Sequence, residues 1–435
     1  MRAPRGLVAL RRLSGFTVSV AITAIISVAA IPTLITALGA VTWAQIGVAQ
    51  TFVQFAAIFV GFGWGATGPA LVASTGLRRR HALFIESVRS RLILALIVAP
   101  VTFGILTIML RGDALIAGLG TIAYLLPALG GTWYYAGAAK PARLLLQNTL
   151  PTTLGTIAGI IAAHVTNQAW SFLLLQAIGS LVAAICDTTY IWRHTHRDAD
   201  GTEPRSTRTV LASQKHAVIT SSTSSLYVTL PVIAINWFLG EGPALATYLI
   251  ADRMFRFASI AFLPVQQFFQ GWVPEVPAEF ARRARVATVA GIAIGAIGGA
   301  CIAFLSPVVA PILSPGASEI DVSLSVSGPL GIAFVGIGTT AVVGYACLVA
   351  VGRTRALAVS TVVGALVGAP LILLAAWAGS LFFVACAVAV SEICVAGYQL
   401  LALRSSLRSG ATLAVSDDAV APLQPPIPRS EESDV

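Results

Sequence analysis

Long apolar runs alternate with short polar stretches along this chain of 435 residues. A helix that crosses a bilayer needs about 20 predominantly apolar residues. Twelve runs are long enough, and few charged residues interrupt them. The pattern therefore predicts an all-α polytopic membrane protein with twelve transmembrane helices. The expected ranges are 14–38, 43–72, 91–110, 114–135, 144–165, 169–192, 218–239, 244–272, 286–313, 330–351, 355–377 and 381–403.

The basic residues support this number of helices because they fall in alternate connections. Cytoplasmic loops of membrane proteins carry an excess of Lys and Arg. With the N-terminus inside, all of the 27 basic residues except Arg111, Arg253 and Arg256 lie at the N-terminus, in cytoplasmic connections or in the tail. Arg91 is assigned to the cytoplasmic connection that follows the second helix. We therefore expect a multi-pass protein with both termini in the cytoplasm.

The longest internal polar connection divides the chain into two sets of six helices. We expect an N-terminal six-helix bundle over 1–192, a cytoplasmic linker over 193–214, a C-terminal six-helix bundle over 215–404 and a disordered cytoplasmic tail over 405–435. AQTFVQFAAI (49–58) and ADRMFRFASI (251–260) match at four of ten positions, each within the second helix of its half. Duplicated halves are common in transporters, whose substrate site lies where the halves meet. The sequence thus predicts two pseudo-symmetric bundles around a central cavity.

The eighth expected helix carries charged residues at bilayer depth. At about 100° per residue, its polar groups fall within an arc of about 140°. Charges at this depth cost about 2.5–3.5 kcal/mol each on insertion scales, and they usually face a bundle interior or a wet cavity. The polar set is Tyr248, Asp252, Arg253, Arg256, Ser259, Gln266, Gln267 and Gln270.

Two interpretations fit this polar face. Asp252 and Arg256 are four residues apart and can neutralise each other in a structural pair. That pair leaves Arg253 unexplained and does not require the three glutamines. A cationic, glutamine-lined groove explains both, and its natural occupant is an anionic ligand.

Two other sets of polar residues border the same region or fasten helices together. Gln50 and Gln54 share a face of the second helix and align with Asp252 and Arg256 in the internal repeat. Polar side chains also join membrane helices, so both roles stay open. For Asn236, which lies in the polar seventh helix, we favour a position that borders the cavity.

Two acidic residues also lie within apolar runs. Glu392 is either a neutral, hydrogen-bonded side chain between helices, which we favour, or a proton or sodium coupling site. Asp187 is expected to reach the cytoplasmic interface from the end of the sixth helix.

Composition narrows the function classes. The chain is 57% hydrophobic and 10% charged, whereas soluble proteins carry about 25% charged residues. Its net charge of +9 follows the topology and does not indicate nucleic-acid binding. The five cysteines form no CxxC pair and the five histidines show no metal-ligand spacing. We expect the lipid bilayer as environment, and no metal, cofactor or nucleic-acid partner.

Several segments resemble the multidrug/oligosaccharidyl-lipid/polysaccharide exporter superfamily, in particular its bacterial polysaccharide flippase branch, which serves O-antigen, capsule and teichuronic-type polymers. They are IPTLITALGAVTWAQIGVAQTFVQFAAIFVGFGWGATGPALVA (31–73), TWYYAGAAKP (132–141) and the ADR-containing YLIADRMFRFASIAFLP (248–264).

The resemblance implies two six-helix lobes whose cavity opens alternately to either side of the bacterial cytoplasmic membrane. It implies a polyprenyl-diphosphate-linked glycan as cargo and a polysaccharide polymerase or glycosyltransferases as partners. By position in the ADR motif, Arg253 is the residue most directly carried over. Lipid II flippases of the superfamily have further arginines in the N-terminal lobe and usually two more helices. The departure here favours export of a surface polysaccharide precursor over a peptidoglycan precursor.

Two other functions are considered. A cation-coupled drug exporter of the same superfamily also has twelve helices, but it usually binds cations, which an arginine-lined groove repels. A membrane glycosyltransferase or polysaccharide polymerase needs catalytic acids or bases, usually in sizeable outer loops. The outer connections here are short. The sequence therefore favours a flippase without enzymatic activity.

Overall fold

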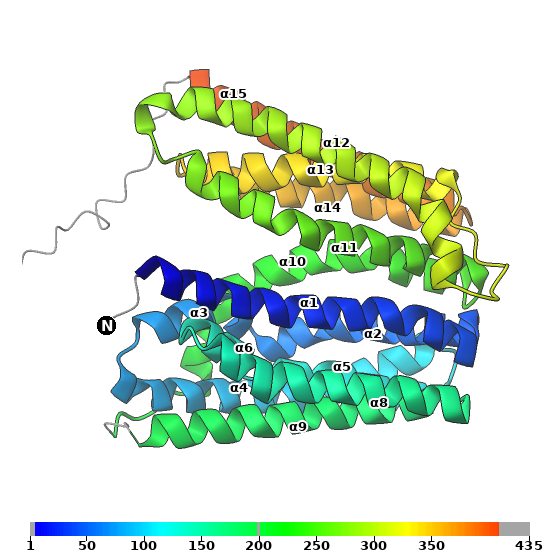
Figure 1. Ribbon diagram of the computed structural model, residues 1–435, viewed down its shortest axis with the longest axis horizontal. Coiled ribbons are helices and arrows are strands. Elements are labelled where there is room, and N and C mark those ends of the chain that lie inside the picture. The colour runs from blue at the N-terminus through cyan, green and yellow to red at the C-terminus, as the bar shows by residue number, and fades with distance from the viewer. Residues whose placement is uncertain (1–4, 198–200, 409–435) are drawn as a thin grey trace, which may run out of the picture.

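The computed structural model describes residues 5–197 and 201–408, except for some side chains within these ranges (Figure 1). The described chain is built from helices and contains no β-strand. Its α-helices are α1 (Arg5–Leu38), α2 (Ala40–Gly61), α3 (Trp64–Ser74), α4 (Arg80–Met109), α5 (Ala114–Leu125), α6 (Thr132–Gly137), α7 (Pro141–Leu144), α8 (Leu150–Thr166), α9 (Ala169–His196), α10 (Thr207–Leu239), α11 (Pro243–Trp272), α12 (Phe280–Leu313), α13 (Leu324–Val342), α14 (Thr354–Trp377) and α15 (Leu381–Arg408).

The helices confirm a polytopic membrane protein. Nine helical segments in the described chain are long and apolar enough to cross a bilayer, and α1 and α10 each hold a shorter apolar stretch. Helix α11 is as long as these segments, but Asp252, Arg253 and Arg256 interrupt its apolar sequence. The nine segments are Ala40–Gly61, Leu77–Met109, Ala114–Gly137, Pro141–Thr166, Ala169–His196, Phe280–Leu313, Leu324–Leu348, Arg355–Trp377 and Leu381–Arg408.

Two of the expected helices are broken near their predicted cytoplasmic ends. The range 43–72 forms α2 and α3, because Phe62 (φ 39°) and Gly63 (φ 79°) adopt left-handed backbone conformations that end α2. The range 114–135 forms α5, a short 3₁₀ segment (Leu126–Leu129) that contains Pro127, and the start of α6. Both breaks line the large cavity described below. Irregular backbone is tolerated at membrane depth in such a place, because the cavity or surrounding protein can satisfy its polar groups.

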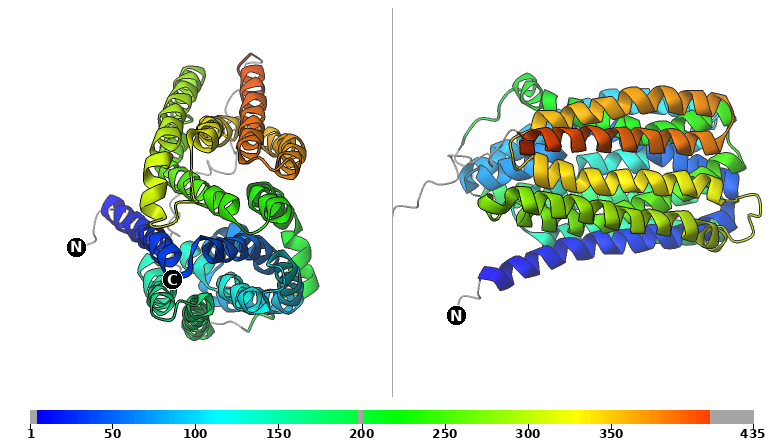
Figure 2. Two further views of the ribbon diagram at one scale, coloured as in Figure 1. Left: turned by 90° about the vertical axis from the view of Figure 1, so that its right-hand side faces the viewer. Right: turned by 90° about the horizontal axis from the view of Figure 1, so that it is seen from above.

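The helices pack in two groups (Figures 1 and 2). Helices α1–α9 pack mainly against one another, through pairs such as α8 with α9 and α2 with α5. Helices α11–α15 form the second group, in which α13 contacts α11, α12 and α15. Helix α10 touches both groups, because it packs on α14 and also on α2, α3 and α4. The chain thus has two helical bodies with α10 shared between them.

Glycines bring helices into close contact within each group. A Cβ atom at Gly155 of α8 would lie 2.6 Å from the Gly179 Cα atom of α9. In the other group, Gly299 of α12 faces Gly331 of α13 in the same way. Small residues at such positions let membrane helices approach closely and pack by van der Waals contact. These glycine-lined contacts fix α8 on α9 and α12 on α13.

The connection between the two halves is shorter than expected. Helix α9 continues to His196 and α10 begins at Thr207, where Ser206 caps it by accepting a hydrogen bond from the Thr209 N–H. Most of the range 193–214 is therefore helical. Of the expected tail, 405–408 belong to α15, and 409–435 lie outside the described residues.

Candidate functional site

A polar cavity of about 820 Å³ lies among the helices of the N-terminal group. Residues from α1, α2, α3, α5, α8 and α9 line it, and Ser221 of α10 closes one side. Arg91 is the one charged residue in this lining, which contains no Asp or Glu in the described part of the chain. Its main polar side chains are Gln50, Gln54, Arg91, Asn148, Thr152 and Gln176. The cavity therefore offers hydrogen-bonding groups and one positive charge.

The predicted glutamines of α2 belong to this cavity. Gln54 is exposed and Gln50 is half-buried, and both line its wall. Gln50 also lines a smaller void of about 60 Å³, together with Tyr124, Gln176 and Arg253. Because both cavities share Gln50, Tyr124 and Gln176, they lie on either side of the same wall.

Arg253 reaches this wall from the other half of the chain. Its Nη2 donates a hydrogen bond to Oε1 of Gln50, which joins α11 to α2. No acidic side chain forms an ion pair with Arg253 in the described chain. The guanidinium is thus held by a neutral partner and retains its positive charge at the boundary between the two halves.

The predicted ion pair between Asp252 and Arg256 is confirmed. The Arg256 Nε donates to Asp252 Oδ2 at 2.6 Å, and the two side chains are 38% and 12% exposed, respectively. The pair therefore supplies little net charge, and Arg253 is the unneutralised cation of this segment.

The glutamines further along α11 lie away from both cavities. Gln266 and Gln270 are half-buried and are absent from the linings of the 820 Å³ cavity and the 60 Å³ void. The side chain of Gln267 lies outside the described residues. The structure thus joins Arg253 to Gln50 and places neither Gln266 nor Gln270 in the lining of these two cavities.

Asn236 and Glu392 occupy other places in the fold. The Asn236 Nδ2 donates to the Met109 carbonyl at 3.0 Å, which ties α10 to the end of α4. Nearby, the Gln45 Nε2 donates to Glu241 at 2.7 Å. Glu392 is half-buried on α15, and its backbone packs against Gly336 of α13. Asn236 therefore joins helices, and Glu392 lies within the second group.

Two charged residues were misplaced by the sequence prediction. Arg91, assigned to a cytoplasmic connection, is 2% exposed within α4, and Asp187, expected to reach the interface, is 1% exposed within α9. Asp187 Oδ2 accepts hydrogen bonds from the Gly131 N–H at 2.8 Å and from Asn148 Nδ2 at 2.7 Å. The helix containing Arg91 begins at Arg80, so Arg91 lies three turns inside it. The polar run of Glu86, Ser87, Ser90 and Arg91 is the signal for a buried face.

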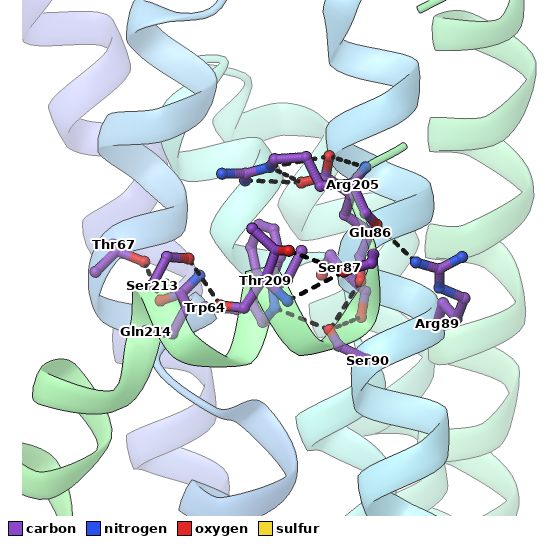
Figure 3. A network of polar contacts seen from close by, with 12 residues as sticks. Trp64, Thr67, Glu86, Ser87, Arg89, Ser90, Arg205, Thr209, Ser213 and Gln214 are labelled. Atoms are coloured by element: carbon purple, nitrogen blue, oxygen red, sulfur yellow. Dashed lines mark hydrogen bonds and ion pairs between the residues drawn. The ribbon is translucent and has the colours of Figure 1, made fainter. Parts of the chain in front are cut away.

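A polar network fastens the start of α10 to the N-terminal group (Figure 3). The Arg205 guanidinium and backbone N–H both donate to the Glu86 carboxylate, with an ion-pair distance of 2.8 Å. The Arg89 Nη2 donates to the Arg205 carbonyl at 2.6 Å, and Thr67 donates to Gln214 at 2.6 Å. The hydrogen bonds with Glu86 raise the pKa of the Arg205 guanidinium above its ordinary value.

No protein-family model matches the chain, and no curated protein matches it in sequence. Solved structures match over most of its length. The lipid II flippase MurJ in an inward closed conformation has a TM-score of 0.72 at 11% identity, over 89% of this chain and 87% of that chain. An inward-facing multidrug resistance MATE family transporter of the MOP superfamily matches with a TM-score of 0.63 at 14% identity, over 88% of this chain and 95% of that chain. A MOP superfamily transporter from Pyrococcus furiosus matches with a TM-score of 0.55 at 16% identity, over 92% of this chain and 96% of that chain. The chain therefore has the fold of MOP superfamily transporters.

Proposed function

We propose that this chain is a flippase that exports a polyprenyl-diphosphate-linked oligosaccharide, a precursor of surface polysaccharide, across the bacterial cytoplasmic membrane. The observation that carries the proposal is the polar 820 Å³ cavity, whose lining residue Gln50 binds the unneutralised guanidinium of Arg253 from the adjoining void. An anionic, sugar-bearing headgroup matches a cavity with positive charge and many hydrogen-bonding side chains. The similarity of fold to MurJ and to MATE transporters supports movement of a solute by alternating access.

The main energetic cost of this transport is moving the charged headgroup through the hydrocarbon of the bilayer. A diphosphate with several sugars must cross about 30 Å of hydrocarbon, where an isolated ion costs tens of kcal/mol by Born solvation. A polar cavity replaces the water around the headgroup, while the polyprenyl chain stays in the lipid. Because the movement makes and breaks no covalent bond, we expect no enzymatic activity.

We infer twelve membrane crossings in two pseudo-symmetric six-helix bundles, over 1–192 and 215–404, joined by the segment 193–214. The nine long apolar segments, the apolar stretches Ile22–Leu38 and Val228–Leu239, and α11 together support this number. The basic connections support a cytoplasmic position for both termini.

We further infer that the described conformation opens toward the cytoplasm. Apart from the Glu86–Arg205 and Thr67–Gln214 contacts that attach the start of α10, hydrogen bonds between the halves lie toward the outer ends of the helices, at Gln45–Glu241 and Asn236–Met109. The 820 Å³ cavity lies on the other side of the Gln50–Arg253 contact, and its lining reaches Gly63 and Trp64 at the start of α3. Opening those outer contacts would expose Gln50 and Arg253 to the outside.

The substrate-binding residues in this proposal are Arg253, Gln50 and Gln54 at the cavity wall, with the Asp252–Arg256 pair fixing α11 beside them. Gln266, Gln267, Gln270 and Asn236 remain candidates for contacts in another conformation of the cycle. Glu392, if it couples an ion, does so within the second half of the chain.

A cation-coupled drug exporter is the second candidate, and the MATE-type fold favours it. The described lining of the cavity, however, holds an arginine and no carboxylate, which disfavours cationic drugs. A membrane glycosyltransferase or polysaccharide polymerase is a weaker candidate, because the described outer connections are short, as between α12 and α13. A polymerase or glycosyltransferase is a more suitable partner, since it would consume or supply the lipid-linked glycan.

The test uses proteoliposomes that contain a fluorescent polyprenyl-diphosphate-linked oligosaccharide. Charge-assisted hydrogen bonds contribute about 1.5–3 kcal/mol each, so Arg253→Ala should slow translocation by roughly 10- to 100-fold. Arg355→Ala removes the same charge from an exposed position on α14 and should leave the rate unchanged. Wild-type translocation by Arg253→Ala protein, present at normal levels, would reject the proposed role of this guanidinium. Transport of a cationic dye in place of the glycan would favour the drug exporter.

A further inference from the structure

A second cavity, of about 310 Å³, lies between α4 and α9 on the outer surface of the N-terminal group. Apart from Arg91, Thr188 and Thr189, its lining is apolar. Leu92 and Ile185, from its two sides, are 47% and 55% exposed although they are large and apolar. In a membrane protein such side chains face lipid. This α4–α9 pocket is therefore accessible to hydrocarbon chains of the bilayer.

Arg91 lines the α4–α9 pocket and also the polar 820 Å³ cavity. It is 2% exposed, so its guanidinium is part of the wall between the two spaces. The wall separates a lipid-facing apolar pocket from a polar interior. The boundary thus carries a buried positive charge.

The guanidinium of Arg91 is only partly satisfied. Its Nε donates to the Ser87 carbonyl at 3.2 Å, and its Nη1 donates to the carbonyls of Ala128 and Gly130 at 2.9 and 2.7 Å. Its Nη2 has no hydrogen-bond acceptor among the described residues, and no described carboxylate forms an ion pair with it. Asp187 is the acidic residue nearby, but its hydrogen bonds come from Gly131 and Asn148.

The guanidinium also lies 5.8 Å from the centre of the Trp133 ring, but neither this ring nor the three carbonyls accept from Nη2. An anion at Nη2 would complete its hydrogen bonding, because a buried charged donor without an acceptor is costly. The N–H groups of Nη2 can donate charge-assisted hydrogen bonds to phosphate oxygens. We propose that the α4–α9 pocket is the site where the lipid anchor of the cargo enters: its chain occupies the pocket, its phosphate binds the free Nη2 of Arg91, and its glycan extends into the polar cavity. This inference rests on the proposed function and adds the route by which the lipid-linked cargo enters the protein.

The position of Arg91 along α4 suits this role. Arg91 lies eleven residues after Arg80, the first residue of α4, which is about 16 Å along the helix axis. The charged residues Glu86 and Arg89 precede Arg91 on α4, and the uncharged apolar run begins at Leu92, so in the inferred topology Arg91 lies at the cytoplasmic end of that run. A lipid-linked glycan awaiting export lies in the cytoplasmic leaflet. One chain in the 310 Å³ pocket matches a polyprenyl anchor, whereas a phospholipid would have to place a second chain elsewhere.

The probe for this site is a polyprenyl diphosphate with a photoreactive group in the first part of its chain, incorporated in liposomes with the wild-type protein. Irradiation should label peptides of α4 and α9 that line the pocket. Ala184→Phe fills the pocket from its lipid side without altering Arg91, and it should reduce labelling at least about tenfold. Val182→Phe is the matched control: Val182 is also on α9, is 42% exposed and does not line the pocket. It should keep wild-type labelling.

Three competitors identify the ligand. Unlabelled polyprenyl diphosphate should abolish labelling, whereas equal amounts of phosphatidylglycerol or of inorganic pyrophosphate should leave most of it. Competition by phosphatidylglycerol at the same concentration would make the pocket a general phospholipid site and overturn the proposal. Because Arg91 also holds two carbonyls, Arg91→Lys is used with a melting temperature as folding control, and it should weaken labelling in a folded protein.

Transport by the same proteoliposomes separates this inference from the proposed function. If Ala184→Phe protein translocates the lipid-linked oligosaccharide at the wild-type rate, the entry site is wrong while the flippase function stands. If wild-type protein translocates no lipid-linked glycan but the pocket is labelled as expected, the site holds a prenyl phosphate and the proposed function is wrong.

Discussion

Arg253 and Arg256 lie three residues apart on α11, yet their surroundings differ. Arg256 is paired with Asp252 on its own helix, whereas Arg253 binds Gln50 on α2. Helical periodicity predicted the polar face that contains all three charged residues, and spacing predicted the ion pair. Neither periodicity nor spacing predicted a partner for Arg253, because a hydrogen bond between residues 203 positions apart depends on how the two halves pack.

A double substitution distinguishes a structural pair from a binding pair. Arg256→Gln leaves Asp252, whose side chain is 12% exposed, without its cation. We expect lower protein levels and slower translocation, because removing one partner of a largely buried pair is destabilising. Asp252→Asn together with Arg256→Gln removes both charges and should restore most of the activity and the melting temperature. A double variant as impaired as the single one would instead give Arg256 a direct role with the cargo.

Burial of single charges was the least predictable property at the residue scale. Arg91 fits the positive-inside pattern when only its neighbours Arg89 and Arg80 are considered. Its burial follows from α4 beginning at Arg80, eleven residues earlier than Arg91, and from the carbonyls of Ala128 and Gly130 that surround it. Those carbonyls belong to the break between α5 and α6, which the apolar run 114–135 does not reveal.

At the scale of elements, the apolar runs predicted most helices and none of the breaks within them. Every expected range consists of helical segments apart from the breaks at 62–63 and 130–131 and the turns at 110 and 349–351, since length and hydrophobicity decide what can cross a bilayer. The break between α2 and α3 requires the left-handed conformation of Phe62, a residue whose type does not indicate it. The start of α10 at Thr207 was missed because its first turns are polar. Those turns are held by Glu86 and Thr67 of the N-terminal group.

The attachment of the segment before α10 can be tested by proteolysis. Glu86→Ala removes the carboxylate that binds both the guanidinium and the backbone N–H of Arg205. Hydrogen bonds to charged groups contribute about 1.5–3 kcal/mol, and the 39% exposure of Arg205 reduces this. We expect trypsin to cleave after Arg205 or Arg208 about tenfold faster. Glu203→Ala, at an exposed position in the same connection, should not change the rate. Equal rates in both variants would mean that the network does not hold this segment.

At the scale of the whole molecule, the fold places an anion-compatible cavity in one half and an unneutralised arginine from the other half at its wall. The sequence predicted two halves and a polar interior. It placed the cavity along the glutamines of α11, whereas the 820 Å³ cavity lies among α1–α9, where the helix breaks at Gly63 and Gly130 line it. Such space depends on how helices from distant parts of the chain diverge, which periodicity within one helix does not determine.

The proposed cargo is an anion, and its transport is expected to respond to the membrane potential. An anion that moves outward follows an inside-negative potential, worth about 2.3 kcal/mol per charge per 100 mV. We expect that a valinomycin-imposed potassium potential, inside negative, speeds outward translocation by the wild-type protein and that its collapse slows it. An uncharged fluorescent lipid that reports leakage is the control. Equal rates with and without the potential would show that no net charge crosses with the cargo in the rate-limiting step.

The glycine-lined contacts have a mechanical consequence. Where Gly155 meets Gly179 and Gly299 meets Gly331, backbones touch without intervening side chains. No side chain between the helices can therefore change rotamer to accommodate a shift. Sliding of α8 on α9 or of α12 on α13 would therefore force main-chain atoms together, and each body should move as a block. The distortion then falls on α10, which packs on both bodies and contains Pro231. A proline lacks the N–H that would complete the helical ladder, which makes this shared helix the natural place for bending strain to concentrate.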